Sequence, residues 1–429
     1  MIKNKSTKIG IVTICLSLVC ILGFNAGEGA QGVKASKIVV MADAAEKKAN
    51  KKPQPTLPAD FTYDSMETVK IGGCKYAYSA VDEYYQSEVV EGGHNFALYE
   101  FKQKYDKKGN PVYTDIVIPD KIGGIPVVAV SYDVFKHHDE IRSIILGKNV
   151  VQIGKEAFEG CKGIKKVVFS KALKRIGYRA FFNCKKLKRI TIPKKVETID
   201  YLAFGDCINL EEVSFKGVPQ KLTNNAISNT KWLKKCKRKG IAAISNGILI
   251  DASGLSGQVK ITGKKVKRII PYAFEGANKI THLEIDSVKE ISGNFLACNN
   301  SIKTLKVTNV EDLPVYCFAQ ALSLKKVVIS SDISEIPKCS FNNCKKLETL
   351  EIHSTKKLKW ATKQEESIIG TYVFGNEVGT KNIKDIYLHS TEVDESITEA
   401  GMPDTVTLHV PAEAVEEYQK YVKCKVVAL

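Results

Sequence analysis

The sequence lacks the short motifs that mark common enzyme and metal sites. It has no G-x-S-x-G elbow, no H-E-x-x-H motif, no Walker loop and no CxxC pair at zinc spacing. The carboxylates form no recognisable acid/base pair, although a pair assembled in space by the fold would be invisible in a sequence. We therefore predict a protein that is not an enzyme, with no catalytic residues, no cofactor and no metal site.

Acidic residues are also scarce relative to basic ones. The 429 residues include 64 Lys and Arg against 47 Asp and Glu, a formal net charge of +17. Charged residues make up 26% and hydrophobic residues 44%, which is ordinary for a soluble protein. The excess of positive charge favours anionic partners such as wall polymers, acidic glycans, membranes or nucleic acid, and it says nothing about the fold.

What the sequence does contain is a repeat. The segment 171–193 aligns with 148–170 before it and with 194–216 after it, at a spacing of 23 residues. Self-similarity at such a period is the mark of a solenoid. Six apolar columns follow from the alignment: Ile153/Ile176/Ile199, Phe158/Phe181/Phe204, Cys161/Cys184/Cys207, Ile164/Leu187/Leu210, Val167/Ile190/Val213 and Phe169/Ile192/Phe215.

Weaker copies extend the register on both sides, to nine coils of 22–23 residues. Their positions in the phenylalanine column are Phe135 upstream and, after an interruption, Phe274, Leu296, Phe318, Phe341 and Phe374. One such unit cannot enclose its own apolar side chains, so neighbouring coils stack and the columns become buried ladders. Inward Ile190 and Ile192 alternate with outward Arg189 and Thr191, which is the period of a strand. We predict an α/β-type repeat solenoid with parallel strands stacked on one face.

The pattern I-x-x-x-A-F-x-x-C-x-x-L-x-x-I-x-I-P, written by residues 176–193, resembles the Bacteroides surface protein A-like (BspA-like, Treponema-type) leucine-rich repeats. The resemblance covers about residues 115–390. It implies a leucine-rich repeat fold, and it says little about function. Several members of this family of secreted and surface proteins are associated with adhesion, so the resemblance implies a cell-surface binding protein.

The chain outside the repeats is divided by composition. Residues 1–35 read as a signal peptide, with a basic start, an apolar run from Ile9 to Phe24 and small residues after it; a structural helix and a lipoprotein anchor on Cys20 are the alternatives. Residues 36–60 read as a disordered basic linker that could also hold the protein against an anionic wall. No later apolar run can span a bilayer. We expect a secreted protein, free or held non-covalently at the cell surface.

The remaining predicted boundaries separate two blocks of repeats from capping segments. Residues 61–114 should form a β-rich N-terminal cap, 115–217 the first repeat block, 264–390 the second and 391–429 a helical C-terminal cap. Residues 218–263 break the period, and Asn246-Gly247 predicts a hairpin there. We interpret this segment as an inserted hairpin over or bulging from the solenoid, with binding and packing equally open as its role.

The cysteines and histidines suggest structure more than chemistry. Cys161, Cys184, Cys207 and Cys344 occupy a column position where alanine substitutes, so we predict free buried thiols that act as small hydrophobes. Disulfide pairing stays open for the remaining cysteines beyond the signal segment, Cys74, Cys236, Cys298, Cys317, Cys339 and Cys424. His137-His138-Asp139 is the only local cluster of metal-ligand types, and His138 occupies a column position, which favours a structural role.

The surface offers one candidate binding site. From residue 148 to 217 there are 13 Lys and 3 Arg against 7 acidic residues, and basic residues recur at repeat spacing. They predict rows along one flank that are either a solvated surface or a docking stripe for a polyanion. The candidate residues are Lys162, Lys165, Lys166, Lys185, Lys186, Lys188, Arg189, Lys194 and Lys195.

Two hypotheses follow for the function. The first is an extracellular protein that binds another protein or an anionic polymer through the solenoid surface. The second is an exported enzyme acting on glycans or peptides, with a site in the 218–263 segment or the N-terminal cap. Nucleic-acid binding fits the charge but not the export signal, and the predicted outer face lacks the aromatic platforms on which bases stack. We expect no nucleic-acid partner.

Overall fold

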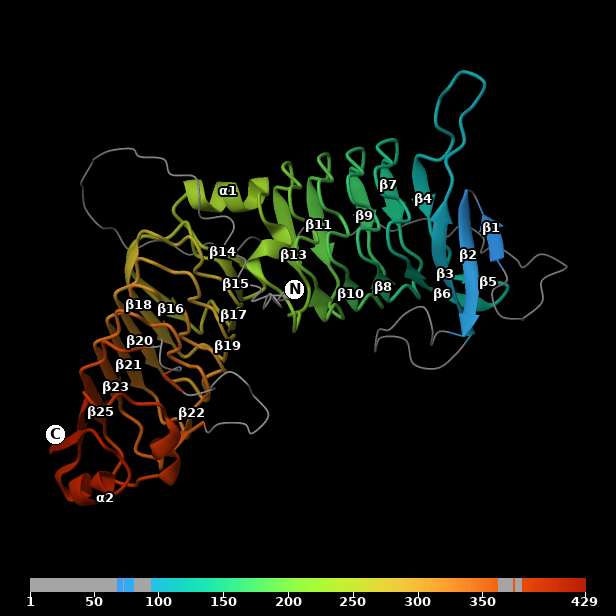
Figure 1. Cartoon of the computed structure of the whole chain (residues 1–429). Helices are drawn as coiled ribbons and strands as arrows, with labels where there is room; N and C mark the ends of the chain where they lie inside the picture. The colour runs from blue at the N-terminus through green and yellow to red at the C-terminus, as the bar shows by residue number, and fades with distance from the viewer. Residues whose placement is uncertain (1–67, 72, 81–93, 362–372, 375–379) are drawn as a thin grey trace, which may run out of the picture. The chain divides into compact units, whose positions relative to one another are not determined.

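The computed structural model describes residues 68–71, 73–80, 94–361, 373–374 and 380–429, and the predicted signal peptide and linker lie outside them. Within the described ranges the backbone runs through successive coils whose strands lie side by side (Figure 1). The strands of neighbouring coils pair in parallel, which confirms the repeat solenoid. The boundaries of the predicted domains stay predictions.

The first repeat block carries its longer strands on one side of each coil. They pair coil to coil in the order β4 (Asp115–Val117), β7 (Ser143–Ile145) and β9 (Lys166–Val168), and then β11 (Arg189–Ile192) with β13 (Glu212–Phe215). In β11 the side chains of Ile190 and Ile192 are buried and those of Arg189 and Thr191 are exposed, as the alternation predicted.

A second ladder of short strands runs along another side of the same coils and continues into the predicted N-terminal cap. The strands before the first coil are antiparallel to one another, and the third of them pairs in parallel with that coil. That these strands act as a cap stays a prediction. The ladder consists of β1 (Thr68–Ile71), β2 (Cys74–Ala80), β3 (His94–Phe101), β6 (Ile125–Val130), β8 (Gln152–Ile153), β10 (Arg175–Ile176) and β12 (Thr198–Ile199), with β5 (Lys121–Ile122) paired to β6.

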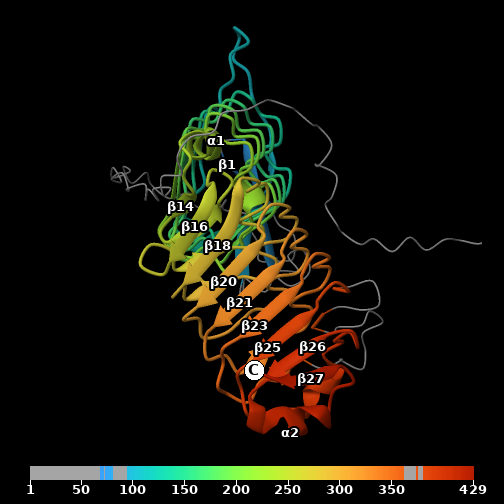
Figure 2. The same cartoon turned by 90° about the vertical axis from the view of Figure 1, so that its left-hand side faces the viewer.

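The second block repeats this arrangement with a longer ladder. Figure 2 shows its strands side by side: β16 (Gly257–Thr262), β18 (Ile280–Asp286), β20 (Thr304–Thr308), β21 (Lys326–Ser330), β23 (Thr349–Ile352), β25 (Asp385–Leu388), β26 (Thr407–Val410) and β27 (Lys425–Ala428). The short strands of these coils are β14 (Ala243–Ser245), β15 (Ile248–Asp251), β17 (Arg268–Ile269), β19 (Glu290–Ile291), β22 (Glu335–Ile336) and β24 (Lys359–Trp360).

The interpretation of residues 218–263 as an insertion is wrong. Lys221 forms a parallel bridge with Thr198, and Ala226 in the 3-10 turn η1 (Asn224–Ile227) accepts a bond from Phe204, so the ladders pass into this segment. The predicted hairpin exists, because β14 and β15 are antiparallel around Asn246 and Gly247, both at positive φ. However, β15 pairs in parallel with β17, and β16 pairs in parallel with β18, so the hairpin segment belongs to the ladders of the following coils.

The repeat was not recognisable in this segment because residues of other types occupy its phenylalanine and cysteine positions. Ile227 stands where the phenylalanine would be, and Thr230 where the cysteine would be. The helix α1 (Lys231–Arg238) replaces the longer strand of this coil, and its Trp232 is fully buried. The segment therefore forms irregular coils of the same stack, and the predicted count of nine does not include them.

Phenylalanine rings form the spine of the first block. Phe135, Phe158, Phe181 and Phe204 are fully buried, and successive rings stack with centroids 5.0, 4.9 and 5.3 Å apart and planes within 11° of parallel. The predicted ladder is therefore confirmed. In the second block the ring comes from Phe295, one residue before the predicted Leu296, and contacts the rings of Phe274 and Phe318 at 5.9 and 6.2 Å.

Each phenylalanine of the spine from Phe135 to Phe341 sits in a turn that contains two residues with left-handed backbone. In three of the coils they are Glu156 and Gly160, Arg179 and Asn183, and Leu202 and Asp206, with φ between 52° and 72°. This conformation costs roughly 1–2 kcal/mol for each residue with a side chain. It keeps the turn from continuing as a helix and aims its amides at the next coil, where Phe158 N donates to Ala180 O at 2.8 Å and Phe181 N to Ala203 O at 2.7 Å.

The cysteines of the repeat column form hydrogen bonds between coils. The thiols of Cys161, Cys184, Cys207 and Cys344 are buried, and each donates to the carbonyl of the preceding coil's phenylalanine at 2.8 to 3.3 Å. The amide of Asn299 and the hydroxyl of Thr380 donate to the equivalent carbonyls of Phe274 and Phe341. The thiols are free as predicted, but they act as hydrogen-bond donors and not only as small hydrophobes. An alanine in this column offers no such donor.

The C-terminal cap is less helical than predicted. The expected final strand is β26, but β27 follows it and extends the ladder by one more parallel pair. The helical spacing yields only the 3-10 turn η3 (Ala412–Ala414) and the five-residue helix α2 (Val415–Gln419), after an earlier turn η2 (Glu395–Glu399). Tyr418 on α2 is buried and its hydroxyl donates to Ser390 O at 3.3 Å. The end of the stack is thus covered by a strand and a short helix together.

Candidate functional site

The nine basic candidates lie on two neighbouring coils of the first block. Lys166 begins β9 and Arg189 begins β11, and the others lie in the turns just before or after these strands. The side chains of all nine are exposed. Because β8 and β10 pair with residues 23 apart in register, equivalent residues of the two coils lie next to each other. The structure therefore gathers the predicted residues on adjacent coils.

Few of these cations are neutralised by acidic neighbours. Lys162 pairs with Asp139 at 3.0 Å, and Arg189 approaches Glu212 at 3.8 Å. For the others, no ion pair with a carboxylate is found among the described residues; these are Lys165, Lys166, Lys185, Lys186, Lys188, Lys194 and Lys195. Exposed ion pairs contribute little to stability in any case, so these lysines are not needed to hold the coils together.

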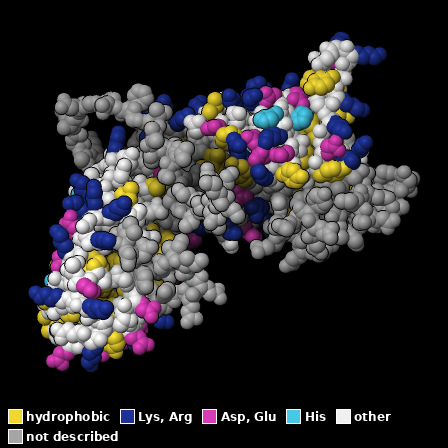
Figure 3. Space-filling model, in the orientation of Figure 1, with side chains coloured by type: hydrophobic (Ala, Val, Ile, Leu, Met, Phe, Trp, Pro, Cys, Tyr) yellow, Lys and Arg dark blue, Asp and Glu magenta, His cyan; other side chains and the backbone are white. Residues whose placement is uncertain are grey.

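The next coil carries acidic residues at positions equivalent to these basic ones. Lys188 O accepts from Glu211 N at 2.9 Å, so Glu211 continues the row of Lys165 and Lys188, and Glu212 faces Arg189 directly across the paired strands. Glu211 in turn pairs with Lys231 of α1 at 3.0 Å. Along these rows, the run of lysines without an acidic partner therefore ends after the coil of β11. Lys and Arg side chains lie among acidic ones over the visible face of the molecule (Figure 3).

A different kind of surface lies at the C-terminal ends of the second block's strands. A pocket of about 510 Å³ opens there beside a group of polar side chains. Its lining residues are Asn309, Val310, Glu311, Ser330, Ser331, Asp332, His353 and Lys356. Two carboxylates, one lysine and one histidine thus line a single hollow on this part of the chain.

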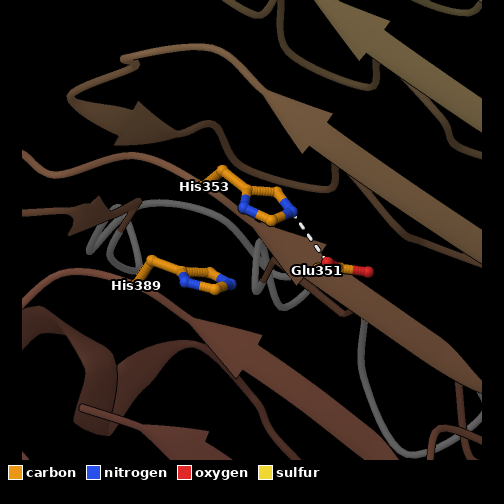
Figure 4. A group of neighbouring side chains, drawn as sticks. All are labelled: Glu351, His353 and His389. Carbon is orange, nitrogen blue, oxygen red and sulfur yellow. Dashed lines mark hydrogen bonds and ion pairs between the residues drawn. The ribbon is translucent and has the colours of Figure 1, made fainter. Parts of the chain in front are cut away.

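Next to this pocket, Glu351, His353 and His389 form a cluster (Figure 4). Glu351 lies in β23, His353 follows that strand, and His389 follows β25. The His353 and His389 rings stack with centroids 4.2 Å apart, and His353 Nε2 lies 2.7 Å from Glu351 Oε1. Each of the three offers one ligand atom, and these atoms all lie within 4.8 Å of one another.

The electrostatics of this cluster are set by its neighbours. Burial and the adjacent His353 lower the pKa of His389, which favours a neutral ring. Burial alone would raise the pKa of Glu351, but Lys326, 3.1 Å away, and His353 stabilise the anion, and the pKa is lowered. Sequence analysis missed this cluster because β25 lies a whole coil after β23. Only the regular pairing of β23 with β25 could have indicated it.

The side chains of the cluster that the sequence showed locally contact other residues in the structure. His138 Nδ1 lies 2.7 Å from Glu140 Oε1, and its ring meets Phe101 edge-on at 4.8 Å. Asp139 accepts from both the backbone and the side chain of Lys162. The structural reading of this cluster is therefore the one the contacts favour.

In the segment 218–263, offered as one place for an enzyme site, the cysteine is not activated as a nucleophile. Burial raises the pKa of the Cys236 thiol to about 11, and it also raises the pKa of Asp251. A nucleophilic cysteine requires the opposite shift, because the thiolate is the reactive form. These groups therefore behave as parts of the packed interior.

Comparison with known proteins decides the family. A family model described as a BspA type leucine rich repeat region matches residues 128–256 and 256–361 in six copies. The chain belongs to this family. The predicted resemblance is thereby confirmed, and the match runs through the segment 218–263, in agreement with the continuous ladders. None of the curated proteins matches this chain.

Solved structures similar to this BspA-type chain include bacterial leucine-rich repeat proteins. A protein from Bacteroides capillosus shares 24% identity over 35% of this chain and 99% of its own, with a TM-score of 0.28. The pneumococcal vaccine antigen PcpA shares 16% identity over 85% of this chain and 99% of its own, with a TM-score of 0.35. A leucine rich cell surface protein from Faecalibacterium prausnitzii shares 16% over 85% and 100%, with a TM-score of 0.32. Within the described ranges, none of the helices is long and apolar enough to cross a membrane.

Proposed function

We propose that this protein is exported and binds macromolecular partners outside the cell through the surface of its coils. Membership of the BspA-type family and the predicted signal peptide support this proposal. The side chains of the buried columns pack against one another and are inaccessible to a partner, so the exposed side chains must make the contacts with it. Adhesion to a host or cell-wall component is the form of binding that we favour.

The observation that carries the proposal is the pair of adjacent coils with unneutralised lysines. Lys185, Lys186 and Lys188 are exposed, and their coil continues the row formed by Lys162 and Lys165. Parallel strands of neighbouring coils lie about 4.8 Å apart, so a row presents positive charge at close, regular spacing. Such a surface fits an extended polyanion, whose charges also recur along its length. We propose an acidic glycan or an anionic wall polymer as the partner of these rows.

The test is retention on a heparin column, with heparin as the acidic glycan. We expect the parent protein to be retained and to elute with salt. A variant with Lys185, Lys186 and Lys188 changed to Glu should elute at clearly lower salt. Arg189 is left in place because it faces Glu212, where a reversal would put two like charges across paired strands.

The matched control changes Lys345, Lys346 and Lys264 to Glu. Lys345 and Lys346 follow Cys344 just as Lys185 and Lys186 follow Cys184, and all three control lysines are exposed. Both variants carry the same net charge, so a general loss of attraction would affect them equally. Equal elution of the two variants would contradict a docking surface on the coils of β9 and β11.

A further inference from the structure

We infer that Glu351, His353 and His389 form a binding site for a divalent transition-metal ion of the zinc class. The inference does not depend on the basic rows or on the proposed function. It rests on three side chains that converge at the C-terminal ends of two paired strands, and on the chemistry of their donor atoms.

The backbone makes the convergence a fixed property of the fold. β23 and β25 pair in register, with Ile352 beside Leu388, so the next residues, His353 and His389, are neighbours across the strands. His353 N donates to Ile329 O at 2.8 Å and His389 N to Ile352 O at 3.2 Å, which ties both residues to the ladder. Glu351 and His353 are two residues apart and so point to the same face. The site is therefore held by strands and not by an unpaired loop.

The distances suit an ion. Ligand atoms that all lie within 4.8 Å of one another leave a central point no more than about 2.8 Å from each, and Zn²⁺ bonds to nitrogen and oxygen measure about 2.0–2.2 Å. Rotations that move each ligand atom by less than about 1 Å therefore complete the contacts. Figure 4 shows the three side chains pointing toward one another from adjacent strands.

The ligand set selects the class of metal. Two imidazoles with one carboxylate suit zinc and its neighbours in the first transition row, whereas Ca²⁺ and Mg²⁺ prefer sets made of oxygen alone. Three protein ligands leave one position of a tetrahedral shell open, as in zinc sites that bind a water or an external group. The His353 side chain is 37% exposed, so an external group can approach the site from solvent.

A lysine beside the site competes with a metal ion for the Glu351 carboxylate. The ammonium group of Lys326 lies 3.1 Å from the Glu351 carboxylate, where it satisfies the anion in the absence of a metal. A bound divalent cation would have to displace this ammonium group or tolerate its repulsion. Lys326 should therefore weaken metal binding, which gives the inference a test in the direction of tighter binding.

The experiment is calorimetric titration of ZnCl₂ into the full chain carrying no polyhistidine tag, at low ionic strength. We expect one Zn²⁺ per chain. His353→Ala and His389→Ala should each weaken binding by at least about tenfold, because each removes a direct ligand. His282→Ala is the matched control, since His282 is an exposed histidine on β18 of the same ladder, and it should bind like the parent. Co²⁺ bound in place of zinc should give the visible absorption of a site with nitrogen and oxygen ligands.

Lys326→Met keeps the test decisive if an alanine variant folds poorly. Removing one positive charge near a divalent ion should tighten binding about tenfold at low salt, and the gain should shrink as salt is added. The gain must keep one Zn²⁺ per chain, because a misfolded chain would expose several buried thiols and bind more than one ion. The inference is overturned if the parent binds no Zn²⁺, if both histidine variants bind like the parent, or if Lys326→Met binds no more tightly than the parent.

Discussion

Replacing Phe181 with alanine tests the physical basis of the architecture. The ring is fully buried, and its two faces stack on Phe158 at 4.9 Å and on Phe204 at 5.3 Å. Phe169 also meets it edge-on at 5.7 Å. Truncation removes the ring and leaves a cavity between two coils that cannot close without moving their ladders. We expect a loss of about 3–5 kcal/mol in the free energy of unfolding.

The neighbouring residue supplies the control. Phe182 is half-buried, and the Arg179 guanidinium lies over its ring at 4.1 Å from the centroid. Phe182→Ala removes the same number of atoms but opens the space to solvent, so we expect a loss of less than about 1.5 kcal/mol. Denaturant unfolding followed by circular dichroism measures both. If Phe181→Ala unfolds at the same midpoint as the parent, the ring ladder is not what joins these coils.

Two further predictions concern titratable groups. Burial raises the pKa of the Cys161 and Cys344 thiols to about 12, so in the native protein both should resist alkylation at pH 8 and both should react after unfolding without any reductant, as peptide mapping by mass spectrometry would show. A reductant requirement would instead reveal a disulfide. The Lys136 ammonium group lowers the pKa of Glu156 from 4.5 to about 2. A lowered folded-state pKa stabilises the protein above pH 4.5, and this stabilisation is lost as pH falls toward 2. Glu156→Gln should therefore reduce the fall in Tm over that window, and an unchanged slope would contradict the assignment.

The regular coils were predictable because they depend on apolar side chains at a fixed period. Ile176, Phe181 and Leu187 recur in neighbouring coils with little change of type, and burial of such columns dominates the energy of stacking. The basic residues of the β9 and β11 coils were predictable for the same reason, since equal spacing in the sequence becomes adjacency in the stack. Their exposure followed from their alternation with the buried positions.

Prediction failed where the position stayed the same but the residue type changed. Ile227 and Thr230 occupy the phenylalanine and cysteine columns without resembling them, so a coil of the stack was taken for an insertion. The first left-handed position of each turn accepts residues as different as Glu156, Arg179 and Leu202, because the hydrogen bonds to the next coil impose the conformation. Only the second position shows the usual residue preference for this backbone, with Gly160 and Asn183 as examples.

The order of residues is enough to establish that the chain coils, which side chains point inward and where positive charge accumulates. Each of these depends on a period that is visible along the chain. Which residues of different coils meet becomes visible only in the folded chain. The thiol of Cys184 meets the carbonyl of Phe158, and Glu351 and His353 meet His389. Hydrogen bonds and metal coordination require donor atoms within a few ångströms of one another, and such distances are set only when the coils pair in register.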